Sequence, residues 1–182
     1  MPLALLGLPS LHTSSKGSPT GSPATWCGHL RQRFGRRRRE GPAYYAGPGN
    51  QFWPTLHTVG FTPRQLAPAE YPLLVEFGVG LTDVCKVSAG SDRAVGTGEL
   101  DVERLVALVE RHRPAVVAFN GKKAAQAVLS RPVSYGPQKE RVGEARVFVL
   151  PSTSGAARGF WDQRPWRQLA EACGSLPPAP TP

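Results

Sequence analysis

The sequence predicts an α/β layer fold that begins near Gly41, and three observations support this prediction. Helical and strand patterns alternate along this part of the chain. Two short, continuous apolar runs are typical of strands that are buried on both faces of a parallel sheet. Loops rich in glycine and small polar residues follow these runs, at the strand ends where open α/β sheets bind ligands.

The first two elements are predicted to be short helices. Residues 61–66 form one, with Thr62 as its N-cap and Pro63 in its first turn. Residues 70–77 form the second, which ends at Gly78.

The third helix has the clearest pattern. Asp101 is a suitable N-cap, and Pro114 ends the helix. Between them, apolar residues recur at the spacing of one helical face, namely Val102, Leu105, Val106 and Val109.

The remaining elements alternate in type. Residues 115–119 are predicted to form a buried strand, and Asn120 is a candidate cap for a helix over residues 121–129. A second buried strand follows at 146–150, and a last helix at 166–172. This order leaves about 130 residues to build one core, which is enough for an independent domain.

Charge and composition divide the chain into three parts. Of its 22 basic and 13 acidic residues, residues 1–41 carry seven basic and only one acidic, including the run Arg36–Arg39. This low-complexity head is predicted to be disordered or aberrant, although the arginine run could also bind nucleic acid or direct targeting. Residues 42–174 form the folded domain, and residues 175–182 a proline-rich tail. The net charge of +9 favours polyanionic partners.

The cysteines and the apolar runs exclude several classes of protein. Cys27, Cys85 and Cys173 are odd in number and widely spaced, so we expect neither a disulfide scaffold nor a metal site. The apolar run Leu3–Leu8 is too short to span a membrane and lacks a basic flank, so we expect no signal peptide. These features favour an intracellular, reducing compartment, which would be the nucleoid-associated cytoplasm in a bacterium.

Four segments carry candidate chemistry. They span residues 44–53, 77–83, 118–122 and 150–158. Each has a structural explanation of its own: a turn, core aromatic residues, a helix cap or an ordinary loop. Together, aromatic residues beside glycine-rich turns, small hydroxyl residues and a loop arginine are typical of a site that stacks a flat ring and binds phosphate.

The four segments resemble the uracil-DNA glycosylase superfamily, in its mismatch-specific branch, which includes thymine-DNA glycosylase. The matching strings are Tyr-x-Gly-Pro-Gly-Asn-x-Phe-Trp, Gly-x-Gly-x-Thr-Asp, Phe-Asn-Gly-Lys and Leu-Pro-Ser-x-Ser, over about residues 43–172. The resemblance implies a three-layer α/β/α sandwich around a short, mainly parallel sheet. It also implies a monomer that acts on duplex DNA, extrudes the target base and hydrolyses its N-glycosidic bond without metal or organic cofactor.

The resemblance also implies roles for residues of the first and third segments. Tyr45 matches the aromatic residue that stacks on the flipped base. Asn50 lies in the turn behind it and is expected to hold that turn more than to touch the base. Lys122 would contact a phosphate, although a solvated lysine at a helix start explains it as well.

The fourth segment matches the loop that enters the duplex and faces the base left without a partner. Ser152 and Ser154 would bind phosphate or line the pocket, and Gly155 belongs to the same loop. Arg158 would hold the DNA backbone or the unpaired base.

One motif of the family is missing. The family's water-positioning Asn or Asp follows an apolar strand, slightly under 20 residues before the Gly-Pro-Gly-Asn turn, and this places it near residues 31–35, where neither strand nor motif is present. Three explanations compete: catalysis has moved to another residue, with Asp83 the candidate; activity is lost and only DNA binding remains; or residues 1–41 are translated out of frame. A chain without this strand is expected to have a gap or an open edge in its sheet.

Three functions therefore stand at this point. The first is a base-excision glycosylase acting on uracil or a mispaired base in DNA. The second is a catalytically impaired homologue that binds DNA or damaged DNA. The third is a hydrolase of free nucleosides, against which the duplex-probing loop and the basic charge argue.

Overall fold

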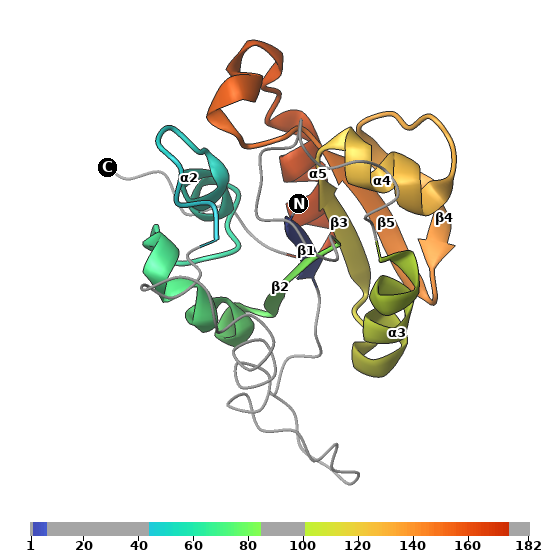
Figure 1. The fold of residues 1–182 in the computed structure, drawn as a ribbon. Helices are drawn as coiled ribbons and strands as arrows, with labels where there is room; N and C mark the ends of the chain where they lie inside the picture. Colours follow the sequence, from blue (N-terminus) through green and yellow to red (C-terminus); the bar gives the residue numbers. More distant parts are fainter. Residues whose placement is uncertain (1, 7–43, 85–100, 175–182) are drawn as a thin grey trace, which may run out of the picture.

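The structure is a computed structural model that describes residues 2–6, 44–84 and 101–174 (Figure 1). Within these residues, five strands form one sheet in the order β2-β1-β3-β5-β4. The strands are β1 (Pro2–Leu6), β2 (Val79–Asp83), β3 (Val116–Asn120), β4 (Gly136–Val142) and β5 (Ala145–Leu150).

The sheet is mixed. β3 and β5 pair in parallel, whereas β1 pairs antiparallel with both β2 and β3, and β4 pairs antiparallel with β5. It follows that β2, β3 and β5 run in the same direction. Their last residues, Asp83, Asn120 and Leu150, lie along one side of the sheet, which we call the carboxyl end of the sheet.

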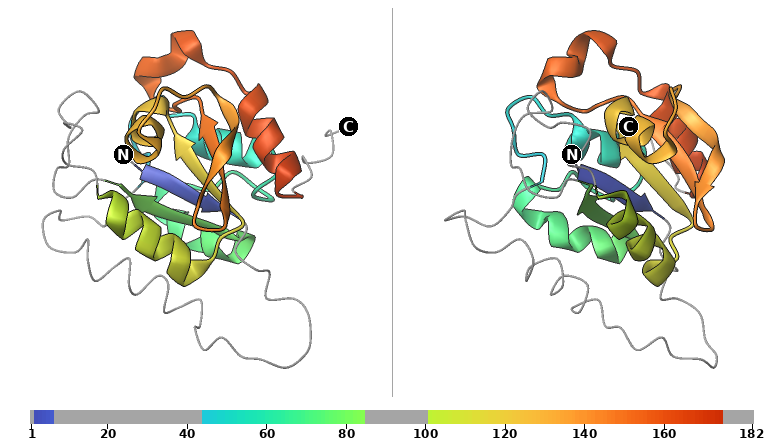
Figure 2. Two further views of the ribbon diagram at one scale, coloured as in Figure 1. Left: turned by 90° about the vertical axis from the view of Figure 1, so that its right-hand side faces the viewer. Right: turned by 45° about the vertical axis from the view of Figure 1, so that its right-hand side comes forward.

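Helices cover both faces of the sheet (Figures 1 and 2). The bounds of the elements are α2 (Phe52–Thr58), η1 (Pro68–Phe77), α3 (Val102–His112), α4 (Lys122–Leu129), η3 (Gly155–Phe160) and α5 (Arg164–Ala172). One buried cluster joins α2, η1 and α5 to the sheet, and a second joins α3 and α4 to it. The chain is thus an α/β protein with three layers, as predicted. Its sheet is mixed and not mainly parallel as expected, since one of the four strand pairs in the described residues, β3–β5, is parallel.

The alternation of side chains along β3 explains the two clusters. Val116 and Ala118 belong to the cluster with α2, η1 and α5, whereas Val117 and Phe119 belong to the cluster with α3 and α4. All four are fully buried. This is why the strand has a continuous apolar sequence and not an alternating one.

Most of the predicted elements are present. The two buried strands, the helices α3, α4 and α5, and the Asp101 cap are confirmed, and the Asp101 carboxylate accepts a hydrogen bond of 3.0 Å from the Arg104 backbone N–H. The helix predicted to end at Gly78 is a 3₁₀ helix with Pro72 inside it, and Gly78 has a left-handed φ of 72°.

Two local predictions are wrong. Residues 61–66 form bends and no helix, and the Thr62 hydroxyl has no hydrogen-bond partner and so does not cap one. Asn120 does not cap α4, because the N-cap position belongs to Gly121 and the Asn120 side chain bonds elsewhere.

The structure adds three strands to the two that the sequence predicted, namely β1, β2 and β4. β1 lies between β2 and β3, where Ala4 pairs with Leu81 on one side and Ala118 on the other. The expected gap in the sheet is therefore filled by the start of the chain. The arginine run, residues 31–35, Cys27, Cys85 and the tail lie outside the described residues.

Candidate functional site

The segment of residues 44–51 crosses the carboxyl end of the sheet. At its start, the Tyr44 hydroxyl donates a hydrogen bond to the Asp83 carboxylate at the end of β2. At its finish, the Gln51 backbone N–H donates to the Thr153 carbonyl, at 2.8 Å, in the loop after β5. Three of the four predicted segments are thereby joined on one side of the sheet.

Asn50 holds the turn in the middle of this segment. Its backbone N–H donates to the Gly47 carbonyl at 3.1 Å, and its side-chain oxygen accepts from the Phe52 N–H at 3.0 Å. The second bond satisfies a backbone donor in the first turn of α2, where no intrahelical acceptor exists. Asn50 thus sets where α2 begins.

Tyr45 is half-buried and stacked on the core. Its ring lies parallel to that of Phe52, with centroids 3.9 Å apart and 19° between the planes. Phe52 is fully buried and makes edge contacts with Trp53 and Trp166. Tyr45 also has a left-handed φ of 56°, which is uncommon for an aromatic residue and is found most often at functional sites.

Asn120 joins the third segment to the fourth. Its side-chain nitrogen donates to the Thr153 hydroxyl at 2.8 Å, and its side-chain oxygen accepts from the Thr153 backbone N–H at 3.0 Å. Gly121, directly after it, donates its N–H to the Leu150 carbonyl at 2.9 Å. The start of the loop after β5 is therefore held by the end of β3.

The outer side of this loop lines a pocket of about 340 Å³. The pocket is formed by Gln51, Ser152, Ser154 and Trp161. The hydroxyl of Ser152 donates to that of Ser154 at 3.2 Å. All four lining side chains are uncharged.

Gly155 lies close to the backbone of the 44–51 segment. A Cβ atom at this position would lie 3.2 Å from the Pro48 carbonyl oxygen, so a larger residue would push the loops apart. Arg158 belongs to η3, and its side chain lies outside the described part of the structure.

Asp83 carries a largely buried carboxyl group at the end of β2. Burial raises the pKa of the Asp83 carboxyl above its ordinary value, and the Arg104 guanidinium and the hydrogen bond from Tyr44 oppose this effect. Burial likewise raises the pKa of the Tyr44 phenol, and Asp83 raises it further. Arg104 also donates to the Asp83 backbone carbonyl at 3.1 Å. Because β1 separates β2 from β3, Asp83 lies about 10 Å from Asn120 along the sheet.

Lys122 begins α4 beside the same end of the sheet. Its ammonium lies 4.4 Å from the centre of the Tyr135 ring, and this ring is 39% exposed. Such a cation–π contact restricts the side chain without neutralising its charge.

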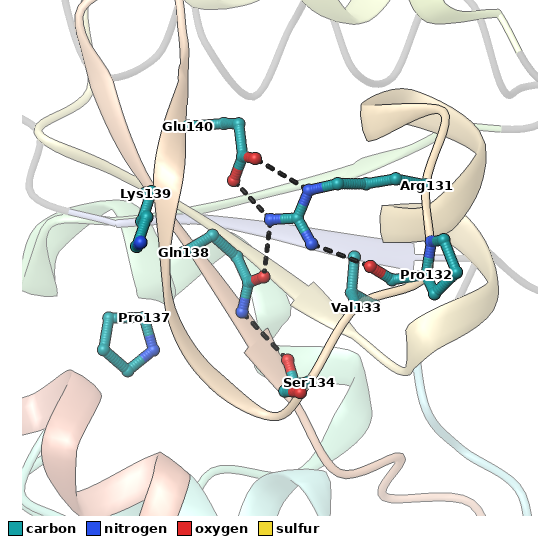
Figure 3. Close-up of a pocket in the computed structure, with 8 residues that line it drawn as sticks. All are labelled: Arg131, Pro132, Val133, Ser134, Pro137, Gln138, Lys139 and Glu140. Carbon is teal, nitrogen blue, oxygen red and sulfur yellow. Dashed lines mark hydrogen bonds and ion pairs between the residues drawn. The ribbon is translucent and has the colours of Figure 1, made fainter.

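A second hollow, of about 490 Å³, lies between the α4–β4 loop and β4 (Figure 3). Arg131 crosses it and forms an ion pair with Glu140 and a hydrogen bond of 3.2 Å with Gln138. The polar groups in this hollow thus bond mainly to one another, and their evident role is to hold the loop against β4.

Sequence reasoning missed three groups that organise the site: Tyr44, Asn120 with Thr153, and Trp161. Tyr44 stands directly before Tyr45, and Thr153 between two serines, so the pattern gave no reason to separate them from their neighbours. Asn120 could have been found, because it directly follows a buried strand. Its side chain was instead predicted to cap the helix that follows, whereas it bonds to Thr153.

Neither a metal centre nor a membrane span is found in the parts of the chain that the structure describes. Residues 2–6, 44–84 and 101–174 contain no cluster of three or more potential metal-binding side chains. Among the same residues, no helix has the length and apolar character that a bilayer crossing requires.

Comparison with known families gives one match. The family model for the uracil DNA glycosylase superfamily matches residues 29–170. The matched range contains all the site residues described above, from Tyr44 to Trp161.

Proposed function

The chain belongs to the uracil DNA glycosylase superfamily, and we propose that it is a base-excision glycosylase for uracil or a mispaired base in duplex DNA. The observation that carries this proposal is the joining of the 44–51 turn, the end of β3 and the loop after β5 into one surface. Tyr45 belongs to the 44–51 turn, Ser152 and Ser154 line the pocket on the loop, and Lys122 begins the helix after β3. These residue types suit stacking of an extruded base and contact with the DNA backbone.

In the proposed reaction, water replaces the base at C1′ of the sugar. The oxygen of the water forms a bond to C1′ as the C1′–N bond breaks, and the departing base keeps the bonding electrons and then gains a proton. Tyr45 stacks on the extruded base. Ser152, Ser154 and Lys122 contact the DNA backbone, and Arg158 holds the DNA backbone or the base left without a partner.

Asp83 is the proposed catalytic carboxylate. When ionised, it would orient the water or stabilise the positive charge that develops on the sugar. Its hydrogen bond from Tyr44 fixes the carboxylate at the start of the segment that carries Tyr45. The reaction as proposed needs one protein molecule and no cofactor.

The direction of β1 favours a second candidate function, that of a DNA-binding homologue without catalysis. Because β1 is antiparallel to β2 and β3, its first residue, Pro2, lies at the carboxyl end of the sheet, opposite Asp83. The family resemblance implies a strand that ends in a catalytic loop at this place. In the structure, the beginning of β1 lies there instead. The surface that would bind DNA does not depend on this position.

A strand-cleavage assay tests these functions. The chain is incubated with a duplex that holds one uracil opposite guanine, and alkali then breaks the abasic sites. Tyr45→Ala should reduce cleavage by about 5- to 150-fold, because stacking on the base is worth about 1–3 kcal/mol. Phe77→Ala is the matched control, since Phe77 is a partly exposed aromatic residue before the opposite end of β2.

The outcomes separate the three functions. Cleavage that falls with Tyr45→Ala and not with Phe77→Ala supports the glycosylase. Binding to the duplex that weakens steeply with salt, without cleavage, supports the DNA-binding homologue. Hydrolysis of free uridine with no dependence on DNA would overturn both.

A further inference from the structure

We propose that Asn120 and Thr153 are a positioning pair that sets the DNA-contacting loop after β5. The inference rests on the proposed function in one respect, namely that Ser152 and Ser154 contact DNA. It assigns to Asn120 a role that no segment of the sequence indicated by itself.

Thr153 is the point where three parts of the site are tied together. Its hydroxyl and its backbone N–H both bond to the Asn120 side chain, and its carbonyl accepts from the Gln51 N–H. The side chain of Thr153 is buried, with 1% of the residue exposed. Asn120 and Gln51 are half-buried, so it is at Thr153 that losing one of these bonds leaves a buried polar group unpaired.

The loop alternates in burial around Thr153. Ser152 and Ser154 are half-buried and line the pocket, whereas Thr153 between them faces inward. Successive side chains of an extended chain point to opposite sides. Fixing the inward residue therefore fixes the direction of both serine hydroxyls.

The requirements at position 120 are specific. The side chain must donate to a hydroxyl and accept from an N–H at the same time, and the asparagine amide provides both groups in one plane. The next residue has a φ of 116°, and a Cβ there would lie 3.7 Å from the Cβ of Ser152. Gly121 thus allows the chain to turn away while Asn120 reaches the loop.

The proposal predicts how single substitutions affect binding. Asn120→Ala should weaken binding to the uracil duplex by about tenfold, the effect of losing one to two buried hydrogen bonds. Thr153→Val removes the hydroxyl and keeps the shape, and it should weaken binding several-fold. Thr153→Ser restores the hydroxyl and should recover most of the affinity.

Asn120→Asp provides a pH-dependent readout. A protonated aspartate can replace both bonds, whereas an ionised one cannot donate to the Thr153 hydroxyl and places a negative charge near DNA. Duplex binding by this variant should therefore fall, relative to the unmutated chain, as pH rises through the pKa of the introduced carboxyl, which is about 3.9 for an unperturbed aspartate. A role in stability alone would not make DNA affinity depend on pH in this way.

The experiment measures duplex affinity by fluorescence anisotropy, cleavage kinetics, and hydrogen exchange of the Gln51 and Thr153 amides. Gln126→Ala, an exposed amide residue on α4, is the matched control. We expect faster exchange at both amides in Asn120→Ala, and a larger change in KM than in kcat. If Asn120→Ala does not fold, the Thr153→Val and Thr153→Ser pair decides the question.

The results distinguish this inference from the proposed function. If the unmutated chain binds the duplex and does not cleave it, the glycosylase is contradicted and the positioning pair is still tested by binding. If Asn120→Ala and Thr153→Val bind as the unmutated chain does, the positioning pair is overturned. Absence of duplex binding by the folded, unmutated chain would also overturn it.

Discussion

The two halves of the carboxyl end of the sheet are built differently. In the half formed by β3 and β5, the strands are parallel, and the loops that follow them are bonded to each other through Asn120 and Thr153. In the half formed by β2 and β1, the strands are antiparallel, so Asp83 lies beside the beginning of β1 and not beside a second strand end.

In the proposed function, this difference separates DNA binding from chemistry. The β3–β5 half carries the loop serines and Lys122, and the hydrogen bonds that hold its loops join residues 47–153, although β3 itself also pairs with β1. The β2–β1 half carries Asp83, and its geometry depends on five residues at the start of the chain. We therefore expect changes in the two halves to affect binding and catalysis unequally.

The largest expected effect comes from removing the buried phenyl ring of Phe52, which packs against the β3–β5 half. Phe52 is fully buried beneath Tyr45 and against Trp166. Phe52→Ala should lower the free energy of unfolding by about 3–5 kcal/mol, the usual cost of deleting a buried phenyl ring. Urea unfolding measures this, with Phe77→Ala as a control expected to cost less than about 0.5–1 kcal/mol. Equal costs for the two variants would contradict the assigned packing.

A proline in β1 tests the other half. Ala4 pairs with residues of both β2 and β3, so Ala4→Pro removes a backbone N–H from the interior of the sheet. We expect a loss of about 1–3 kcal/mol in the free energy of unfolding, from one buried backbone acceptor left unpaired. Hydrogen exchange should increase in β2 more than in β5. Unchanged exchange in β2 would show that β1 does not hold it in the sheet.

Asp83→Asn should change stability in a pH-dependent way. Burial raises the pKa of Asp83 in the folded protein, so the folded state binds this proton more tightly than the unfolded state does. The contribution of this proton to the free energy of unfolding is therefore fully present at low pH and is lost as the pH rises through the pKa of Asp83 in the folded protein. The asparagine of D83N does not ionise. The melting temperature of D83N minus that of the unmutated chain should therefore be larger at pH 7 than at pH 3.5. A smaller difference at pH 7 would contradict the burial of this carboxylate.

The sequence predicted the β3–β5 half better than the β2–β1 half, for a physical reason. Strands buried on both faces, such as residues 116–119 and 147–150, contain continuous apolar runs that can be recognised without knowledge of their neighbours in space. β4 alternates exposed and buried residues and carries charges, and β2 contains glycine and threonine, so neither stands out by composition.

The bonds of the site depend on tertiary structure. Asn120 followed a predicted strand and preceded a predicted helix, so local reasoning assigned it to the helix. Its true partner, Thr153, is 33 residues away. The pairing of β1 with β2 spans more than 70 residues, and no local pattern indicates such a pairing.

The smallest expected effect concerns Lys122, which belongs to the β3–β5 half and not to the β2–β1 half. Lys122→Ala should weaken duplex binding a few-fold and reduce the slope of log affinity against log salt by about 0.9, the value for one lost phosphate contact. Lys139→Ala is the matched control, since Lys139 is exposed on β4, away from the site. Tyr135→Ala should give part of the Lys122 effect, because the ring restrains the ammonium over a distance of 4.4 Å. An equal loss in the Lys139 variant would mean that the chain binds DNA through its overall charge and not through the loops at the carboxyl end of the sheet.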